Sequence, residues 1–126
     1  MALMPYQYVV LRCVPRVDRE EFVNVGVALH CEDADFLGCR WQICEDRIRA
    51  LAPGLDLAVL ADVLTHLTGV CSGDPAAGQA ATETPSRRFG FLKAPRSTVV
   101  QPSPVHGGLT SDPVGELDRL LTALVL

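Results

Sequence analysis

The feature that most constrains the fold is a strict alternation of side chains along residues 23–30. Apolar residues occupy every second position, with small or polar residues between them: Val23, Val25, Val27 and Leu29 against Asn24, Gly26, Ala28 and His30. Such a pattern predicts a β-strand with one face in a core. Because a glycine inside a strand marks a bulge or a close approach to the backbone, we expect a neighbouring helix or a ligand at Gly26.

Two other segments also predict strands. Residues 6–14 are apolar or β-branched on both faces and end at Pro15, which is typical of a central strand that is covered on both sides. Residues 36–43 alternate again after a short acidic connection at residues 32–35. A connection this short predicts an antiparallel hairpin.

Helical spacing follows the third strand. It predicts a helix over residues 45–52, a longer one over 56–71 with Asp56 as N-cap, and a last one over 112–124 with Asp112 as N-cap and Pro113 at its first position. A short strand is expected at residues 97–101. This order predicts an α+β domain, a mainly antiparallel sheet of about four strands with three helices packed on one side.

The chain length suits one domain, and one segment inside it lacks any periodic pattern. A chain of 126 residues can form a single core, so we expect one domain over residues 1–126. Residues 72–86 are rich in Gly, Ala and Pro, with no apolar periodicity. This composition predicts a flexible loop, followed by too little chain for a second core.

Charge and cysteine usage exclude several classes of protein. Fifteen acidic and eleven basic residues give a net charge of −4, which argues against a surface that coats nucleic acid or anionic membrane. The N-terminus has no signal-peptide pattern, and no apolar run reaches the roughly 18 residues of a membrane span. The five cysteines form no CxxC pair, and His30, Cys31, Cys39 and Cys44 match no common zinc spacing. We expect a cytoplasmic protein without metal or cofactor.

The positive charge is concentrated in one segment. Residues 87–96 hold four basic residues and no acidic one, so seven basic and fifteen acidic residues remain elsewhere, a net −8. Cations interleaved with aromatic rings suit a phosphate-bearing or acidic partner. The candidate binding residues are Arg87, Arg88, Phe89, Phe91 and Lys93. The alternative is that the two phenylalanines anchor a loop onto the core while the arginines stay in solvent.

Polar residues near the predicted strand ends form a second candidate cluster: Arg12, Glu21, Asn24 and Arg96. They would converge if residues 15–21 fold back. A carboxylate among arginines has a lowered pKa, so Glu21 is a salt-bridge partner sooner than a general base. No nucleophile stands beside a histidine and an acid in a catalytic arrangement, and no phosphate-binding or dinucleotide-binding motif occurs. We therefore predict no catalytic residue.

The same residues carry a resemblance to a known family. The string Glu21 to Val27 (EFVNVGV), the preceding strand from Tyr8 to Pro15, the Ala94-Pro95-Arg96 segment and the closing Asp112-Pro113 helix resemble the bacterial family called domain of unknown function 3037. The resemblance implies no established activity. Its members are often encoded beside a HipA-like serine/threonine kinase, which implies a partner or regulatory subunit, and its polar signature falls on Arg12, Glu21, Asn24 and Arg96.

Three functional hypotheses follow, in order of preference. The first is an accessory domain that binds a protein, with a HipA-like kinase as the implied partner, through residues 87–96 and the polar strand-end cluster. The second is binding of nucleic acid or a nucleotide phosphate through residues 87–96. The third is a hydrolase or transferase centred on Arg12, Glu21 and Asn24. A homodimer that hides a sheet edge is open beside all three.

Overall fold

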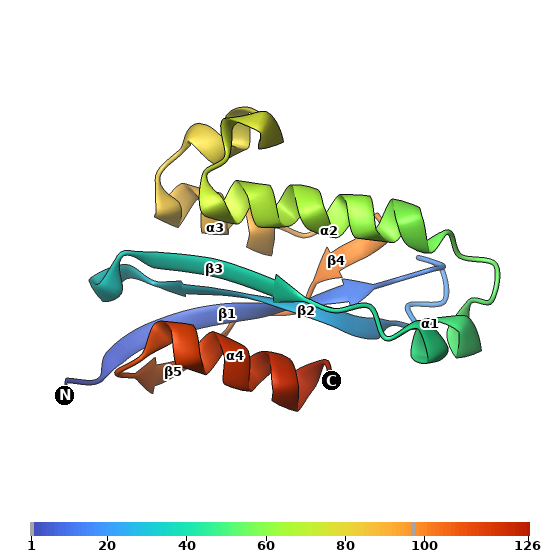
Figure 1. Cartoon of the computed structure of the whole chain (residues 1–126), viewed down its shortest axis with the longest axis horizontal. Coiled ribbons are helices and arrows are strands. Elements are labelled where there is room, and N and C mark those ends of the chain that lie inside the picture. Colours follow the sequence, from blue (N-terminus) through green and yellow to red (C-terminus); the bar gives the residue numbers. More distant parts are fainter. Residues whose placement is uncertain (1, 97) are drawn as a thin grey trace.

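The computed structural model describes residues 2–96 and 98–126 (Figure 1). Its elements are, in chain order, β1 (Met4–Cys13), β2 (Val23–Cys31), the 3-10 turn η1 (Glu32–Ala34), β3 (Phe36–Trp41), α1 (Glu45–Leu51), α2 (Leu57–Ser72), the 3-10 turns η2 (Pro75–Ala77) and η3 (Gln79–Thr82), α3 (Pro85–Lys93), β4 (Val100–Pro102), β5 (His106–Thr110) and α4 (Pro113–Leu124). Within the described residues, five strands form one antiparallel sheet, and four α-helices accompany it. The predicted α+β class is confirmed.

The sheet is built on β1, which has neighbours along both edges. β2 pairs with one edge, and β3 pairs with β2. Along the other edge, β4 pairs with residues 11–13 of β1 and β5 with residues 4–8. Between them, the Ser103 N–H donates to the Val10 carbonyl, and the Val10 N–H donates to the Ser103 hydroxyl, both at 2.8 Å. β4 and β5 thus form one interrupted edge strand.

The helices cover both faces of the sheet, which differs from the one-sided packing expected from the sequence. α2 and α3 lie on one face and α4 lies on the other (Figure 1). Each face has its own buried core. Val9, Leu11, Leu64 and Phe89 belong to the first core, and Leu29 and Leu117 belong to the second.

A bulge in β2 supplies the apolar residues for both faces. Gly26 and Asn24 pair with consecutive residues of β1, so Val25 between them has no partner there. The extra residue reverses the side-chain alternation. The apolar residues before the bulge therefore pack in the α2 core and those after it in the α4 core: Val23 and Val25 in the first, Val27 and Leu29 in the second.

The backbone of Gly26 is approached by the neighbouring strand. A Cβ atom on Gly26 would lie 2.9 Å from the Arg40 carbonyl oxygen and 3.0 Å from the Cβ atom of Trp41, both on β3. The sequence correctly predicts a bulge or close approach at this glycine. The approaching element is β3, however, instead of the helix or ligand expected from the sequence.

The chain between α2 and β5 has more regular structure than the sequence predicts. Residues 72–86 include η2 and η3, and Ala81 is buried there. Helix α3 begins within the predicted loop, because Thr84 caps it and Pro85 occupies its first turn. The strand expected at residues 97–101 is found as β4, while Ser97 lies outside the described residues.

Candidate functional site

Arg12 and Asn24 are paired residues on β1 and β2, next to the bulge. The Asn24 side-chain amide donates a hydrogen bond to the carbonyl oxygen of Leu124, at the end of α4, at 3.1 Å. The Arg12 guanidinium lies over the ring of Phe22, with 4.0 Å between Cζ and the ring centroid. Arg12 Nε and Asn24 Oδ1 are both buried, and neither has a hydrogen-bond partner among the described residues. The pair therefore has unused hydrogen-bonding capacity.

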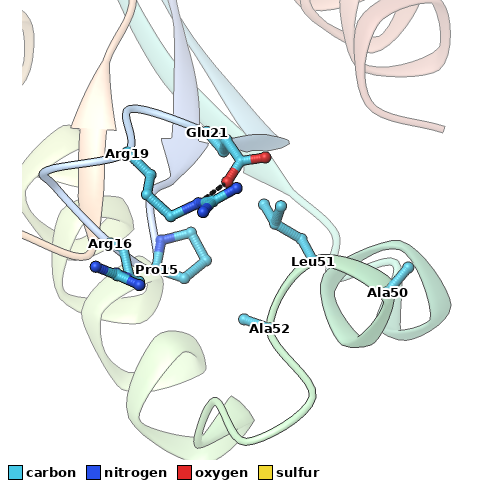
Figure 2. Close-up of a pocket in the computed structure, with 7 residues that line it drawn as sticks. All are labelled: Pro15, Arg16, Arg19, Glu21, Ala50, Leu51 and Ala52. Carbon is cyan, nitrogen blue, oxygen red and sulfur yellow. Dashed lines mark hydrogen bonds and ion pairs between the residues drawn. The ribbon is translucent and has the colours of Figure 1, made fainter.

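Glu21 does not join that pair. It is exposed in the β1–β2 loop, where its carboxylate forms an ion pair with Arg19 (Figure 2). Both residues border a hollow of about 450 Å³, which is also lined by residues 50–52 at the end of α1. The hydrogen bond from Arg19 lowers the pKa of Glu21. Glu21 is thus a salt-bridge partner, as expected, but its cation is Arg19 instead of an arginine of the predicted cluster.

Arg96 also lies apart from the other members of the predicted cluster. Its guanidinium is over the ring of Phe91, 4.7 Å from the centroid, and donates a hydrogen bond to the Phe91 carbonyl oxygen. Partial burial lowers the pKa of Arg96. Among the described residues, no hydrogen bond or ion pair links Arg96 to Arg12, Asn24 or Glu21. The structure brings two of the four predicted residues together.

The predicted basic and aromatic residues of helix α3 differ in how far they are buried. Phe89 is only 1% exposed, and its ring centroid lies 5.4 Å from that of His30 on β2. Arg88 donates hydrogen bonds to two backbone carbonyl oxygens, at 2.9 Å and 3.4 Å. Arg87, Phe91 and Lys93 are exposed. The anchoring interpretation therefore holds for Phe89, and the solvent-exposed interpretation holds for Arg87.

A groove of about 310 Å³ runs beside α3 at the end of the sheet. α3 contributes Ser86, Phe89 and Lys93, and the remaining lining residues are Pro5, Tyr6, Gln7, His30, Glu32 and Asp33. Lys93 Nζ lies 5.5 Å from the Phe89 ring centroid. Burial lowers the pKa of His30, so its ring is neutral at pH 7. The groove thus combines an aromatic wall with charges of both signs.

None of the helices in residues 2–96 and 98–126 covers the sheet surface next to this groove. Pro5 and Gln7 on β1 pair with Leu109 and Gly107 on β5, and all four are exposed. Leu3 lies just before β1, two residues from Pro5. Leu3 is 63% exposed and Leu109 62%. We call these five residues the open sheet face.

Sequence patterns do not predict the open sheet face. Pro102, Pro104 and the glycines at 107 and 108 interrupt every strand pattern, so the sequence predicts an irregular segment at residues 102–108. β5 forms there because its backbone pairs with β1, a contact between distant parts of the chain. The available sequence signal was that Leu3 and Leu109 lie outside every predicted core face.

Four of the five cysteines lie in the interior of the protein. Cys13, Cys31, Cys39 and Cys71 are buried free thiols, and burial raises the pKa of Cys13 to about 11. A thiol with a raised pKa is a poor nucleophile at neutral pH. In residues 2–96 and 98–126, no group of three or more His, Cys, Asp or Glu side chains is placed to hold a metal ion.

None of the helices in the described part of the chain is both long enough and apolar enough to cross a membrane. The longest, α2, has 16 residues and carries Asp62 and His66.

Comparison with known proteins identifies the family. A family model described as "Protein of unknown function (DUF3037)" matches residues 8–125. No curated protein and no solved structure matches the chain. The match includes the Arg12–Asn24 pair, α3 and α4. The chain therefore belongs to the DUF3037 family.

Proposed function

We propose that this domain binds another protein at the open sheet face. The observation that carries the proposal is the exposure of Leu109 on β5 and of Leu3 just before β1, at 62% and 63%, beside sheet residues that none of the described helices covers. Contiguous exposed apolar surface of this kind marks interaction sites in proteins. The five residues of the open sheet face include no charged side chain, and charged residues are typically depleted from interface centres.

The edge strand supports an extended segment as the occupant. β5 pairs only with β1 among the described strands, so its outer edge has backbone groups available for pairing. The β4 half of the same edge is protected by Pro102 and Pro104, whereas β5 contains neither proline nor a Lys, Arg, Asp or Glu. A partner strand would use these backbone groups and place a side chain against Leu109 on the same face.

The groove beside α3 gives this site a way to distinguish between partner side chains. Pro5 and Gln7 belong both to the open sheet face and to the groove lining, so the two surfaces are continuous. A partner that continues from β5 across Pro5 and Gln7 would reach the groove, where Lys93 and the acidic pair Glu32 and Asp33 are available for contact. This makes Lys93, one of the residues predicted from the sequence, part of the proposed interface, while Phe89, at 1% exposed, supports it from the core.

The experiment is co-expression followed by size-exclusion chromatography. A HipA-like kinase, the partner implied by the family resemblance, is the first candidate. Leu109→Asp should weaken the complex by more than about tenfold, because it charges the interface centre. Val59→Asp is the matched control, since Val59 is 52% exposed on α2, outside the open sheet face. Equal loss of binding in both variants contradicts the proposal, and elution of the domain alone as a dimer identifies a second copy as the occupant.

The outer side of α3 favours a second candidate, a phosphate-bearing ligand. Its specific observation is the Arg96 guanidinium stacked on the exposed Phe91 ring, near the exposed Lys93. Binding of this kind falls steeply with salt. RNA or DNA binding that is lost in Phe91→Ala and retained in Leu109→Asp would support this candidate over the protein interface.

A further inference from the structure

The far end of β1 carries a second hollow, separate from the open sheet face. Its volume is about 450 Å³, and it is lined by Arg12, Val14, Val17, Glu20, Phe22 and Gln101. Arg12 is seven residues along β1 from Pro5, which is about 20 Å in a strand. The Arg12–Asn24 pairing and the hydrogen bond from Asn24 to Leu124 put this hollow near the C-terminal end of α4.

The position of the Arg12 side chain is fixed by its neighbours. Phe22 lies under the guanidinium plane at 4.0 Å, and Asn24 and Gln101 are its cross-strand neighbours on either side. A guanidinium stacked on a ring keeps its edge free for hydrogen bonds. Because the side chain is already ordered, it loses little conformational entropy when it binds a ligand.

Arg12 differs from the arginines of the β1–β2 loop because no acidic side chain among the described residues pairs with it. Arg16 pairs with Asp18 at 2.6 Å, and Arg19 pairs with Glu21. Among the described residues, Arg12 forms no ion pair, and its buried Nε has no hydrogen-bond acceptor. A buried donor without an acceptor destabilises a fold, and a ligand that supplies the acceptor removes this penalty. The fold therefore keeps an oriented cation beside a hollow without supplying its anion.

We infer that Arg12 binds a carboxylate group in this hollow, with an apolar group of the same ligand against Val17 and Phe22. A planar carboxylate matches the guanidinium fork. The hollow contains one cation and the acidic Glu20, so a singly charged anion fits its electrostatics better than a doubly charged phosphate. Val17 is 47% exposed and Phe22 43%, which leaves apolar surface beside the guanidinium for a ligand to cover.

The test is a titration of the full chain followed by NMR, at the Arg12 Nε–H signal in the wild type and at the backbone N–H signals of residues 12 and 22 in the wild type and all variants. N-acetyl-leucine is the probe, N-acetyl-leucinamide is its uncharged control, and inorganic phosphate is the competing anion. A saturable shift with the acid alone is expected. Arg12→Gln should weaken binding by about tenfold or more, because it removes the charge-assisted pair, whereas Arg16→Gln should leave it unchanged.

A second variant keeps the test valid if Arg12→Gln does not fold. Phe22→Leu retains an apolar side chain but removes the ring that orients the guanidinium, and it should weaken binding several-fold with little change in thermal unfolding. Equal binding of acid and amide, tighter binding of phosphate, or unchanged affinity in both variants overturns the inference.

The source of the carboxylate is distinguished by a second probe. A hexapeptide that ends in leucine with a free carboxylate should bind about tenfold tighter than N-acetyl-leucine if the natural ligand is a protein C-terminus, since it adds contacts to the loop. Equal affinity of the two probes indicates a small carboxylic acid. Neither outcome depends on the open sheet face, so Leu109→Asp should bind both probes normally.

Discussion

The hydroxyl of Tyr6 on β1 donates a hydrogen bond to the carboxylate of Glu116 on α4, although 110 positions separate the two residues in the chain. Arg119 donates to the same carboxylate from Nη2 at 2.9 Å. Burial raises the pKa of Tyr6 to about 12, and the hydrogen bond from Arg119 lowers the pKa of Glu116. The last helix is therefore fastened to the first strand by a polar contact as well as by its apolar face.

Replacing Tyr6 with Phe should remove this contact while it keeps the ring. We expect Tyr6→Phe to lower the free energy of unfolding by about 1 kcal/mol at pH 7. In the wild type, the raised pKa of Tyr6 means that stability is lost as pH rises from about 10 toward 12. The lowered pKa of Glu116 means that stability is lost as pH falls below about 4.

Urea unfolding across this pH range measures both effects. Tyr6→Phe should lack the alkaline loss due to residue 6 and show a slightly shallower acid loss, because Arg119 still holds Glu116. Glu116→Gln is the matched variant that removes the acid component. An alkaline profile identical to the wild type would place the Tyr6 hydroxyl outside the contact.

Two glycines should respond to alanine in opposite directions. At Gly26 the new Cβ would lie 2.9 Å from a backbone oxygen of β3, and such overpacking costs about 1–3 kcal/mol. At Gly90 on α3 nothing lies within 4 Å of the new Cβ, so Gly90→Ala should gain about 1 kcal/mol of helix propensity. Thermal unfolding of the two variants checks both signs, and a neutral Gly26→Ala would mean that β2 and β3 separate easily at the bulge.

The sequence predicts those parts of the fold that local signals determine. An apolar, β-branched run predicts β1, alternation predicts β2 and β3, and Asp56 and Asp112 cap α2 and α4 as expected. The face of the sheet on which each strand residue lies is harder to predict. Val25 can be recognised as unpaired only from the register between β1 and β2. A single unpaired residue places Val27 and Leu29 in the opposite core from Val23 and Val25, and no periodicity within β2 reveals which residue it is.

The candidate sites were predictable to the extent that they lie on paired strands. Arg12 and Asn24 meet as expected, whereas Glu21 uses Arg19, a nearer cation in the same loop. A local partner wins because closing a two-residue contact costs little chain entropy. The open sheet face was not predictable, since it is defined by the absence of a covering helix above Leu109, which only the tertiary arrangement determines.

The two phenylalanines of α3 allow the anchoring interpretation to be measured. Phe89 is 1% exposed in the core, so Phe89→Ala should lower the free energy of unfolding by about 3–5 kcal/mol. Phe91 is 37% exposed, and Phe91→Ala should cost less than about 1 kcal/mol. Chemical denaturation of both variants gives these values, and equal losses would mean that Phe91 also packs into the core in solution.

Glu21 and Asn24 belong to the same family string yet should differ in their effect on stability. Glu21→Gln should leave the melting temperature unchanged, because the Glu21–Arg19 pair is exposed and screened by solvent. Asn24→Ala removes the hydrogen bond to the Leu124 carbonyl and should cost about 1 kcal/mol, with faster amide hydrogen exchange in the last turn of α4. If Glu21→Gln proves the more damaging change, Glu21 must pair with Arg12 in solution, and the Arg12 hollow would then already hold its carboxylate.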